Sequence, residues 1–378
     1  MRDFDLPGRS PVHATQAMAA TSHPLATGAA LDVLKAGGNA LDAAIAAVAT
    51  LCVVEPQSTG IGGDCFVLLA PGGRDEVIGF NGSGRSPAAA TLDWFLSRGH
   101  ERIEQHSPHS VTVPGAIDAW CRLHKDHGRL DFASLLAPAI RYAEGGYPVH
   151  ARVRHDWLES AGLLALDPAT AAIFLPGGKV PAEGDLHRQP RLAETLKAIA
   201  RGGRKAFYEG PVAQAMVRRL AAAGGLHTLA DFAEAAGEYV TPVTTDYRGH
   251  RLHMIPPNNQ GLTALIMFNI LEGYELGKYG PLSAERTHLE LEAGRLAYAA
   301  RDRWLAERSA MPVTTEQLLS KDWAAELRAK ISLDRAMSDI PDLGLTTSDT
   351  VYLSVVDGER NAVSFINSVY HSFGSGIT

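Results

Sequence analysis

A run of hydroxyl side chains stands immediately before a strand pattern near the end of the chain. Residues 344–350 read GLTTSDT, and residues 351–356, VYLSVV, are rich in the residue types of strands. A threonine hydroxyl is a weak nucleophile that becomes useful when a neighbouring base takes its proton. In loops, hydroxyl side chains more often bond the local backbone. Taken alone, the segment favours local hydrogen bonding and offers Thr350 only as a candidate nucleophile.

The strand after Thr350 is predicted to belong to a hairpin. A second strand is expected from Ala362 to Val369, and the four residues DGER lie between the two strands. An Asp-Gly pair favours a tight turn, and a two-residue turn at Gly358 and Glu359 places Thr350 opposite Asn367. A hairpin alone is marginal in water. The rest of the chain, or sequence outside it, must therefore supply a larger sheet.

The remaining elements are mainly helical. Apolar periodicity predicts helices over residues 25–35 and 40–54, and CFVLLA and DEVIGF predict strands on either side of a Pro-Gly-Gly turn. Further helices are expected over residues 130–145, 191–201, 211–223, 229–235 and 285–308, with strands near residues 247–254. No repeat or linker is evident. These elements predict one integrated domain of the α+β class.

Composition excludes several function classes. The 378 residues carry a formal net charge of -7, which gives no electrostatic case for nucleic acid. The longest apolar run, residues 40–54, is shorter than the roughly 20 residues of a membrane span, so it predicts a buried helix and no membrane partner. The first residues have no apolar core of a signal peptide, and the expected location is cytoplasmic. The three cysteines lack zinc spacing and are expected to be buried thiols.

Three further motifs were weighed for chemistry. The glycines of residues 60–63 lack the lysine and spacing of a phosphate loop, so they favour a tight turn. His288 and Glu292 share a helical face, but no third metal ligand is evident, and a surface pair is the favoured interpretation. The loop PPNNQG at residues 256–261 precedes a helix, and its amides could line a pocket. No metal and no cofactor is predicted.

Long segments of the chain resemble the gamma-glutamyltransferase family of N-terminal-nucleophile hydrolases. The resemblance begins with AATSHPLATGAALDVLKAGGNALDAAIAAVATLCVVEPQSTGIGGDCFVLL and continues through VTVPGAIDAW, PAIRYAEGGYPV, AFYEGPVAQAM and PPNNQGLTAL. It ends with HLELEAGRLAYAARDR and DTVYLSVVDGERNAVSFINSVYHSFGSGI. These segments follow the family order over nearly the whole chain. The resemblance implies the four-layer αββα sandwich of these hydrolases, with additional helices.

The resemblance also implies self-cleavage. Such precursors are cut before a threonine, and the matching bond here joins Asp349 to Thr350. The cut would leave residues 1–349 as a large subunit and residues 350–378 as the start of a small one, forming a heterodimer. The freed α-amine of Thr350, with an ordinary pKa near 8, could then take the hydroxyl proton. Because the family's small subunit continues further, its remainder is an expected partner, and this chain alone is not expected to turn over substrate.

The resemblance assigns the remaining site residues, with departures. Ser368 matches the hydroxyl that steadies the nucleophile, although it could be an ordinary strand serine. A one-residue bulge in the hairpin would set Ser368, in place of Asn367, opposite Thr350. Ser83 stands where the family has an arginine that binds a substrate carboxylate, and Arg85 is either its replacement or a surface residue. Tyr370 replaces an asparagine that holds the glutamyl group, unless it is a packed strand aromatic. Asn367 is a further substrate-binding candidate.

These departures imply a small carboxylate-bearing amide substrate other than glutathione. The family members that resemble oxamate amidohydrolase and the cephalosporin acylases are of this kind. Two alternatives stay open. The chain could be a true gamma-glutamyltransferase that recruits Arg85, or an inactive fragment with a binding or scaffold role.

Overall fold

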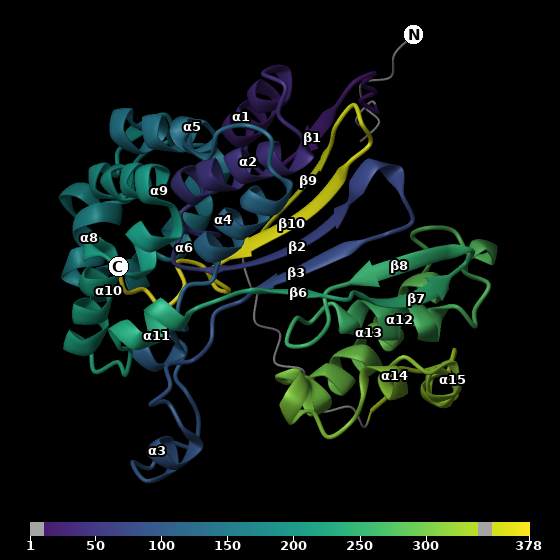
Figure 1. The fold of residues 1–378 in the computed structure, drawn as a ribbon. Coiled ribbons are helices and arrows are strands. Elements are labelled where there is room, and N and C mark those ends of the chain that lie inside the picture. The colour runs from purple at the N-terminus through teal and green to yellow at the C-terminus, as the bar shows by residue number, and fades with distance from the viewer. Residues whose placement is uncertain (1–10, 339–349) are drawn as a thin grey trace.

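A six-stranded antiparallel sheet forms the centre of the protein. The computed structural model describes residues 11–338 and 350–378. The strands are ordered β1-β9-β10-β2-β3-β6. Their bounds are β1 Met18–Ala20, β2 Asp64–Ala70, β3 Ile78–Gly82, β6 Glu238–Val240, β9 Val351–Val356 and β10 Ala362–Ser368. The final hairpin therefore lies between strands from the first hundred residues (Figure 1).

The β9–β10 hairpin has a longer turn than its sequence predicts. Val356 pairs with Ala362, and the Asp357 amide donates to the carbonyl of Asn361, so residues 358–360 form a three-residue loop. Arg360, the last residue of this loop, has a φ of 67°, as expected for a type I turn closed by a left-handed residue. The simple two-residue turn is therefore wrong, and the one-residue bulge that sets Ser368 opposite Thr350 is confirmed. The extra residue shifts the pairing so that Asn367 faces Val351.

Asp357 explains why this turn is well defined. One oxygen of its carboxylate accepts from the amides of Glu359 and Asn361, and the other accepts from the amide of Ala40 at 2.9 Å. Ala40 begins helix α2 (Ala40–Val54), whose first turn has amides that need an acceptor. The same carboxylate thus closes the hairpin loop and ties it to the start of α2.

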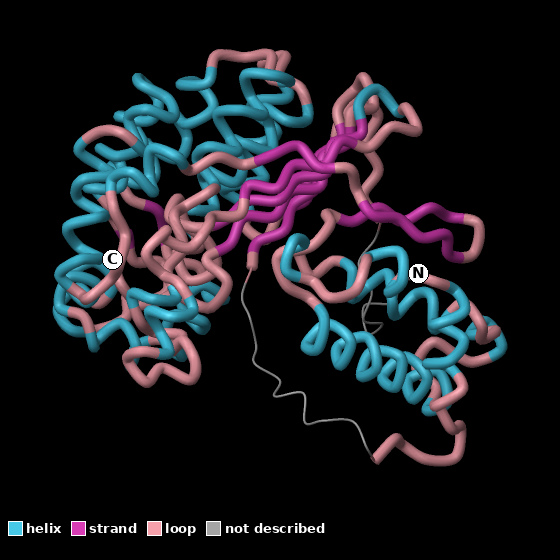
Figure 2. The backbone as a smooth tube through the Cα atoms, turned by 60° about the horizontal axis from the view of Figure 1, so that its bottom comes forward, coloured by secondary structure: helices cyan, strands magenta, loops and turns pink. Residues whose placement is uncertain are grey.

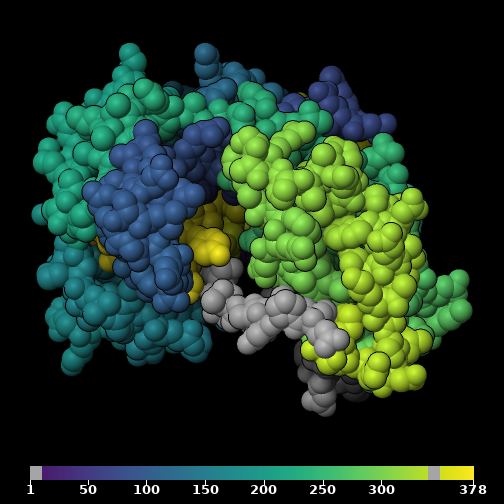
Figure 3. All heavy atoms as spheres, turned by 90° about the horizontal axis from the view of Figure 1, so that it is seen from below, coloured from purple at the N-terminus to yellow at the C-terminus, as the bar shows by residue number. Residues whose placement is uncertain are grey.

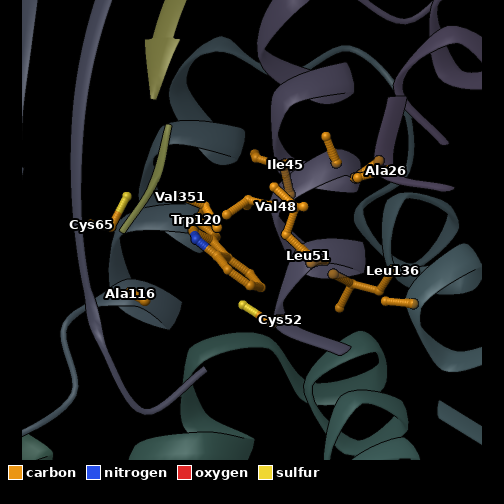
Figure 4. Close-up of a cluster of buried hydrophobic side chains, with 14 of the residues drawn as sticks. Ala26, Ile45, Val48, Leu51, Cys52, Cys65, Ala116, Trp120, Leu136 and Val351 are labelled. Carbon is orange, nitrogen blue, oxygen red and sulfur yellow. The ribbon is translucent and has the colours of Figure 1, made fainter. Parts of the chain in front are cut away.

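Helix α2 is the core of the larger lobe. All of its residues are buried, which confirms the predicted buried helix, and Asn39 and Asp42 form a capping box at its start. Helices α1 (Pro24–Lys35), α4 (Ala116–His127) and α5 (Phe132–Gly145) surround it on one face of the sheet (Figure 1). Figure 4 shows the indole of Trp120 among side chains of α2 and beside Val351.

A further group of helices completes this lobe. They are α6 Ala151–Glu159, α7 Ala161–Leu166, α8 Pro168–Phe174, α9 Pro190–Tyr208, α10 Pro211–Ala222 and α11 Leu229–Glu234, with the small β4–β5 pair Tyr147–Pro148 and Leu186–His187. The residues after β10 run into this group, where the Ser160 and Ser372 hydroxyls are 2.8 Å apart. Helix α3 (Leu92–Leu96) lies on an excursion that projects from the body (Figure 1).

The segment between β6 and residue 338 forms a second lobe with its own hydrophobic core. It contains the hairpin β7 Val243–Tyr247 and β8 His250–Met254, and helices α12 Leu262–Leu271, α13 Ala284–Trp304, α14 Thr315–Leu318 and α15 Lys321–Arg328. Its helices lie apart from those of the larger lobe (Figure 2), and its buried residues form a hydrophobic cluster separate from that of the larger lobe.

Glu292 belongs to this second core and corrects another expectation. Its side chain is almost fully buried, pairs with Arg295 at 2.7 Å, and accepts from the amide of Met337. His288 instead contacts the carbonyl of Ser332. The two residues are therefore structural, and the surface-pair interpretation is wrong for Glu292.

The other face of the large sheet is only partly covered. Alternate residues of β9 and β10 are buried against the helices, while Tyr352 and Val356, which point the other way, are exposed. Helices and one sheet establish the α+β class, but the described residues contain no second large sheet, so the four-layer sandwich stays a prediction. Nowhere in residues 11–338 or 350–378 is there a helix with the length and apolar character to cross a membrane.

Candidate active site

The register of the hairpin brings two hydroxyl groups together where strand β9 begins and strand β10 ends. Thr350 immediately precedes β9 and is exposed, and Ser368 is the last residue of β10. Their hydroxyl oxygens lie 3.0 Å apart, within hydrogen-bond distance. The Ser368 hydroxyl also accepts from the amide of Tyr370 at 2.8 Å. Asp349, the other residue of the predicted cleavage site, lies outside the described residues.

Two more polar side chains continue this row across neighbouring strands. Ser368 pairs with Asp64 at the start of β2. Cys65 pairs with Gly82 of β3, and continuing that register by one residue sets Ser83 beside Asp64. Directly paired residues of antiparallel strands point to the same face. Thr350, Ser368, Asp64 and Ser83 therefore form one row along the ends of four adjacent strands.

Glycines allow the backbone segments under this row to approach closely. A Cβ on Gly63 would lie 2.0 Å from the carbonyl oxygen of Ser368, and one on Gly84 would lie 1.7 Å from that of Val113. The Gly63 carbonyl accepts from the amides of Gly115 and Ala116, where α4 begins. Gly63 thus permits close packing at the site, and its amide donates to the carbonyl of Gly60 at 3.2 Å, which confirms the predicted tight turn.

Asp64 is a site residue that the sequence analysis missed. One oxygen of its carboxylate accepts from the amide of Gly84 at 2.7 Å. Burial raises the pKa of this carboxyl to about 6, although the Gly84 hydrogen bond acts in the opposite direction. A charged residue between a glycine-rich turn and a buried strand was the available signal, because such a position is normally apolar.

A polar cavity of about 220 Å³ opens beside Ser83. It is lined by Asn81, Ser83, Gly84, Arg85, Ser86, Ala236, Glu238, Asn258 and Glu307. A second hollow adjoins it and shares Arg85, Glu238 and Glu307. Figure 3 shows that the surface is hollowed between the two lobes, with C-terminal residues at the floor of the hollow. Residues of both lobes thus line the two cavities, and C-terminal residues lie at the floor of the hollow between the lobes.

The cavity holds charged side chains that have no partner within the described chain. Arg85, Glu238 and Glu307 are exposed, and none of their side chains makes a hydrogen bond or ion pair in residues 11–338 and 350–378. A guanidinium in this state can bind a carboxylate through two parallel hydrogen bonds. Glu238 and Glu307 could accept a cationic group of the same ligand.

Ser83 is held in the wall of this cavity. Its hydroxyl donates to Asn81 at 2.7 Å and accepts from the side-chain amide of Asn258 at 3.0 Å. Asn258 belongs to the loop of residues 256–261, which therefore lines a pocket, as its sequence suggested. The Ser83 hydroxyl is thus engaged by protein groups, and Arg85 is the cation available at this wall.

The other two candidates lie in different environments. Asn367 is completely buried, where it accepts from the Trp120 indole and donates to Thr59 and Gly60. Its placement anchors the end of β10 and does not favour substrate contact. Tyr370 is 67% exposed with a φ of 73°, so it is not the packed strand aromatic that was considered.

The thiols and the one cluster of potential metal ligands among the described residues do not provide a further reactive group for the row of Thr350, Ser368, Asp64 and Ser83. Cys52 and Cys65 are buried as expected, whereas Cys121 is only partly buried, so the expectation is wrong for that residue. Burial raises the pKa of the Cys52 thiol to about 12, which keeps it neutral. His155, Asp156 and Glu159 are grouped closely enough for a metal, but they already form ion pairs with Arg152 and with one another on helix α6.

Comparisons with known proteins agree on one family. The family model described as gamma-glutamyltranspeptidase matches residues 26–378. The glutathione hydrolase-like YwrD proenzyme of Bacillus subtilis is 40% identical over 365 residues, covering 96% of this chain and 69% of that protein. The acylase ACY 1 proenzyme of Pseudomonas sp. strain SE83 is 36% identical, covering 97% and 68%. The crystal structure of cephalosporin acylase from Bacillus halodurans superposes with a TM-score of 0.91 at 40% identity, covering 100% of this chain and 70% of that one.

Proposed function

The chain belongs to the gamma-glutamyltranspeptidase family, and on this premise we propose that it is a self-cleaving amidohydrolase or acyltransferase with Thr350 as its nucleophile. The observation that carries the proposal is the 3.0 Å contact between the Thr350 and Ser368 hydroxyls where the adjacent strands β9 and β10 begin and end. The two relatives above are named proenzymes, which supports a processing step. The expected products are residues 1–349 and a piece beginning at Thr350.

Cleavage before Thr350 creates the base that the reaction needs. Within the intact chain the nitrogen of Thr350 is an amide and cannot accept a proton. After cleavage it is an amine, which takes the hydroxyl proton as the oxygen attacks the substrate carbonyl. The carbonyl–nitrogen bond then breaks, and the ammonium returns the proton to the leaving amine. Water repeats the sequence on the acyl-enzyme and releases the acid, while an acceptor amine would give transfer instead.

Ser368 and Asn367 would position the Thr350 nucleophile for its attack on the carbonyl in different ways. The Ser368 hydroxyl is within hydrogen-bond distance of the nucleophile and can fix its rotamer. The buried Asn367 would hold the end of β10, and hence Ser368, in place. A position held within a few tenths of an ångström matters because attack requires a near-ideal approach to the carbonyl.

We propose that the acyl group carries a carboxylate that binds Arg85. Arg85 is the unpaired cation of the cavity beside Ser83, and Asn258 adds an amide donor there. This assignment favours a small carboxylate-bearing amide. Tyr370, exposed next to Ser368, would border the same acyl group. The remainder of the small subunit is the expected partner, and no cofactor enters the reaction.

A gamma-glutamyl substrate is the second candidate, and one observation favours it. Glu238 and Glu307 lie in the same cavity as Arg85 without an ion pair among the described residues. Such a set of charges suits a ligand end that carries both a carboxylate and an ammonium group. The relative named glutathione hydrolase-like agrees with this alternative.

Three amides test the proposal and separate the candidates. A glutaryl anilide and a gamma-glutamyl anilide differ only in the ammonium group, and oxamate is a much shorter acid amide. We expect the self-cleaved full-length protein to hydrolyse the glutaryl anilide better than the gamma-glutamyl anilide, and Thr350→Ala to hydrolyse neither. The reverse preference would favour the gamma-glutamyl candidate. A cleaved protein that forms no acyl-enzyme with any of the three would contradict the proposed activity.

A further inference from the structure

Asp64 connects the two halves of the candidate site. On one side it pairs across the strands with Ser368, which contacts Thr350. On the other side its carboxylate accepts from the amide of Gly84, which stands between Ser83 and Arg85. A single side chain is therefore adjacent both to the nucleophile pair and to the segment that carries the unpaired cation.

The segment around Gly84 has few other attachments near Arg85. The Arg85 carbonyl accepts from the amide of Val113 at 2.9 Å, and the Gly84 amide donates to Asp64 at 2.7 Å. Gly84 also approaches the Val113 carbonyl so closely that it has no space for a side chain. The hydrogen bond to Asp64 thus fixes the backbone at the residue immediately before Arg85.

Resting on the proposed function, we propose that Asp64 is a positioning residue, which holds Arg85 where it binds the substrate carboxylate and makes that binding depend on the charge of Asp64. An ionised carboxylate accepts a shorter and stronger hydrogen bond than a neutral acid. Protonation of Asp64 therefore loosens the Gly84 amide and the Arg85 backbone. Affinity for the substrate carboxylate falls, while the Thr350–Ser368 pair keeps its geometry.

The pH at which this happens follows from the burial of Asp64. Because burial raises the pKa of its carboxyl to about 6, the residue becomes protonated as pH falls through about 6, and KM should rise over that interval. Charged or titratable side chains on the neighbouring elements include Arg85, Glu238, Tyr370, His371, Asp118, Arg122 and Cys65. Asp118 is ion-paired with Arg204, and burial raises the pKa of the Cys65 thiol well above its usual value. His371 is the group that must be controlled.

The test uses KM and kcat for the glutaryl anilide with self-cleaved full-length protein. Asp64→Ala should raise KM about tenfold and change kcat by less than about threefold, since it removes the acceptor of a charge-assisted bond. Asp64→Asn keeps an acceptor, so KM should rise less and lose its inflection near pH 6. Asp32→Asn, an exposed residue of α1, is the matched control and should behave as wild type.

A double-mutant cycle tests whether Asp64 acts through Arg85. If it does, Asp64→Ala should add almost nothing to the KM of Arg85→Ala, because the two changes remove one interaction. Amide hydrogen exchange at Gly84 gives a readout without substrate. Protection should be high at pH 7.5, fall below pH 6 in wild type, and be absent at both values in Asp64→Ala.

Several outcomes would overturn the inference and leave the proposed function intact. Additive effects of Asp64→Ala and Arg85→Ala, a loss in kcat at constant KM, or an inflection that disappears in His371→Gln and survives in Asp64→Asn would each do so. Failure of the proposed function is distinguishable, because wild type would then form no acyl-enzyme although Gly84 still showed its pH-dependent protection.

Discussion

The hydroxyl oxygens of Thr350 and Ser368 lie 3.0 Å apart because the hairpin that carries them turns through three residues. A shorter turn would have set Thr350 opposite Asn367, whose side chain is in the core. A one-residue change in register moves every side chain of a strand to the other face. The left-handed Arg360 at the end of the loop thus determines which residue meets the candidate nucleophile.

Ser368 should affect the reaction through its hydroxyl and not through its volume. Ser368→Ala is expected to slow both self-cleavage and turnover by about tenfold to a hundredfold, as the loss of a positioned hydroxyl does elsewhere. Ser368→Thr, which keeps the hydroxyl, should recover most of the rate. Rates are measured from the appearance of the two fragments on a gel and from anilide hydrolysis. Ser364→Ala, on the same face of β10, is the control. Equal rates for Ser368→Ala and wild type would exclude the proposed role.

Arg85 should govern substrate affinity. Arg85→Ala is expected to raise KM for the glutaryl anilide by about tenfold to a hundredfold, because a charge-assisted contact to the carboxylate is lost. Arg85→Lys keeps the charge and should recover only part of the lost substrate affinity, since an ammonium lacks the planar fork of donors. An uncharged acetyl anilide should react equally with all three proteins, and exposed Arg74→Ala serves as the surface control. If Arg85→Ala left KM unchanged, the cavity would not be the carboxylate site.

The stability of the fold should decrease in mild acid. Burial lowers the pKa values of His23 and His187 to about 4, below the ordinary value of 6.5, so the folded state favours the neutral rings. Their stabilising contribution is present above pH 6.5 and is lost as pH falls from 6.5 to 4. Each accounts for up to about 2–3 kcal/mol of the free energy of unfolding. Asp64 acts in the opposite direction, because its pKa is raised and the folded state favours its protonated form. Its contribution to the free energy of unfolding therefore increases as pH falls from 6 to 4.

Urea unfolding at pH 7.5 and pH 5 measures this loss. His187→Gln removes one of the two rings, so the difference between the two pH values should shrink, although the variant is less stable at pH 7.5. The exposed His250→Gln should retain the wild-type difference. A wild-type protein as stable at pH 5 as at pH 7.5 would contradict the assignment of neutral buried histidines.

Local patterns were enough to predict much of the fold. Helix α2 was predicted with its bounds, because an apolar run of this length that is interrupted only by Asp42 and Thr50 has few other solutions. The strands of the final hairpin were also predicted from residue types. Its register stayed open between a two-residue turn and a one-residue bulge, because the choice depends on Asp357, whose carboxylate bonds Ala40 on a distant segment. Local turn preferences contain no information about that contact.

In the candidate site too, some residues could be predicted from the sequence, whereas others depend on contacts between distant segments. Thr350 and Ser368 were nominated by family resemblance, and the structure sets their hydroxyls in contact. Asp64 was missed because its partners, Ser368 and Gly84, are brought to it only by the sheet. The position of Asn367 in the core was likewise hidden, since alternation of faces along β10 follows from the register. The unpaired charges of Glu238 and Glu307 depend on how the two lobes meet.

The central claim is that this chain is cut between Asp349 and Thr350 to expose the nucleophile. Intact mass spectrometry of the purified full-length protein, with Thr350→Ala and Thr347→Ala as paired variants, tests it most directly. We predict two pieces in wild type and Thr347→Ala, with Thr350 as the first residue of the second piece, and a single uncut chain in Thr350→Ala. A wild-type protein that stays whole under conditions where it is folded, or a cut at the same bond in Thr350→Ala, would contradict the assignment of Thr350.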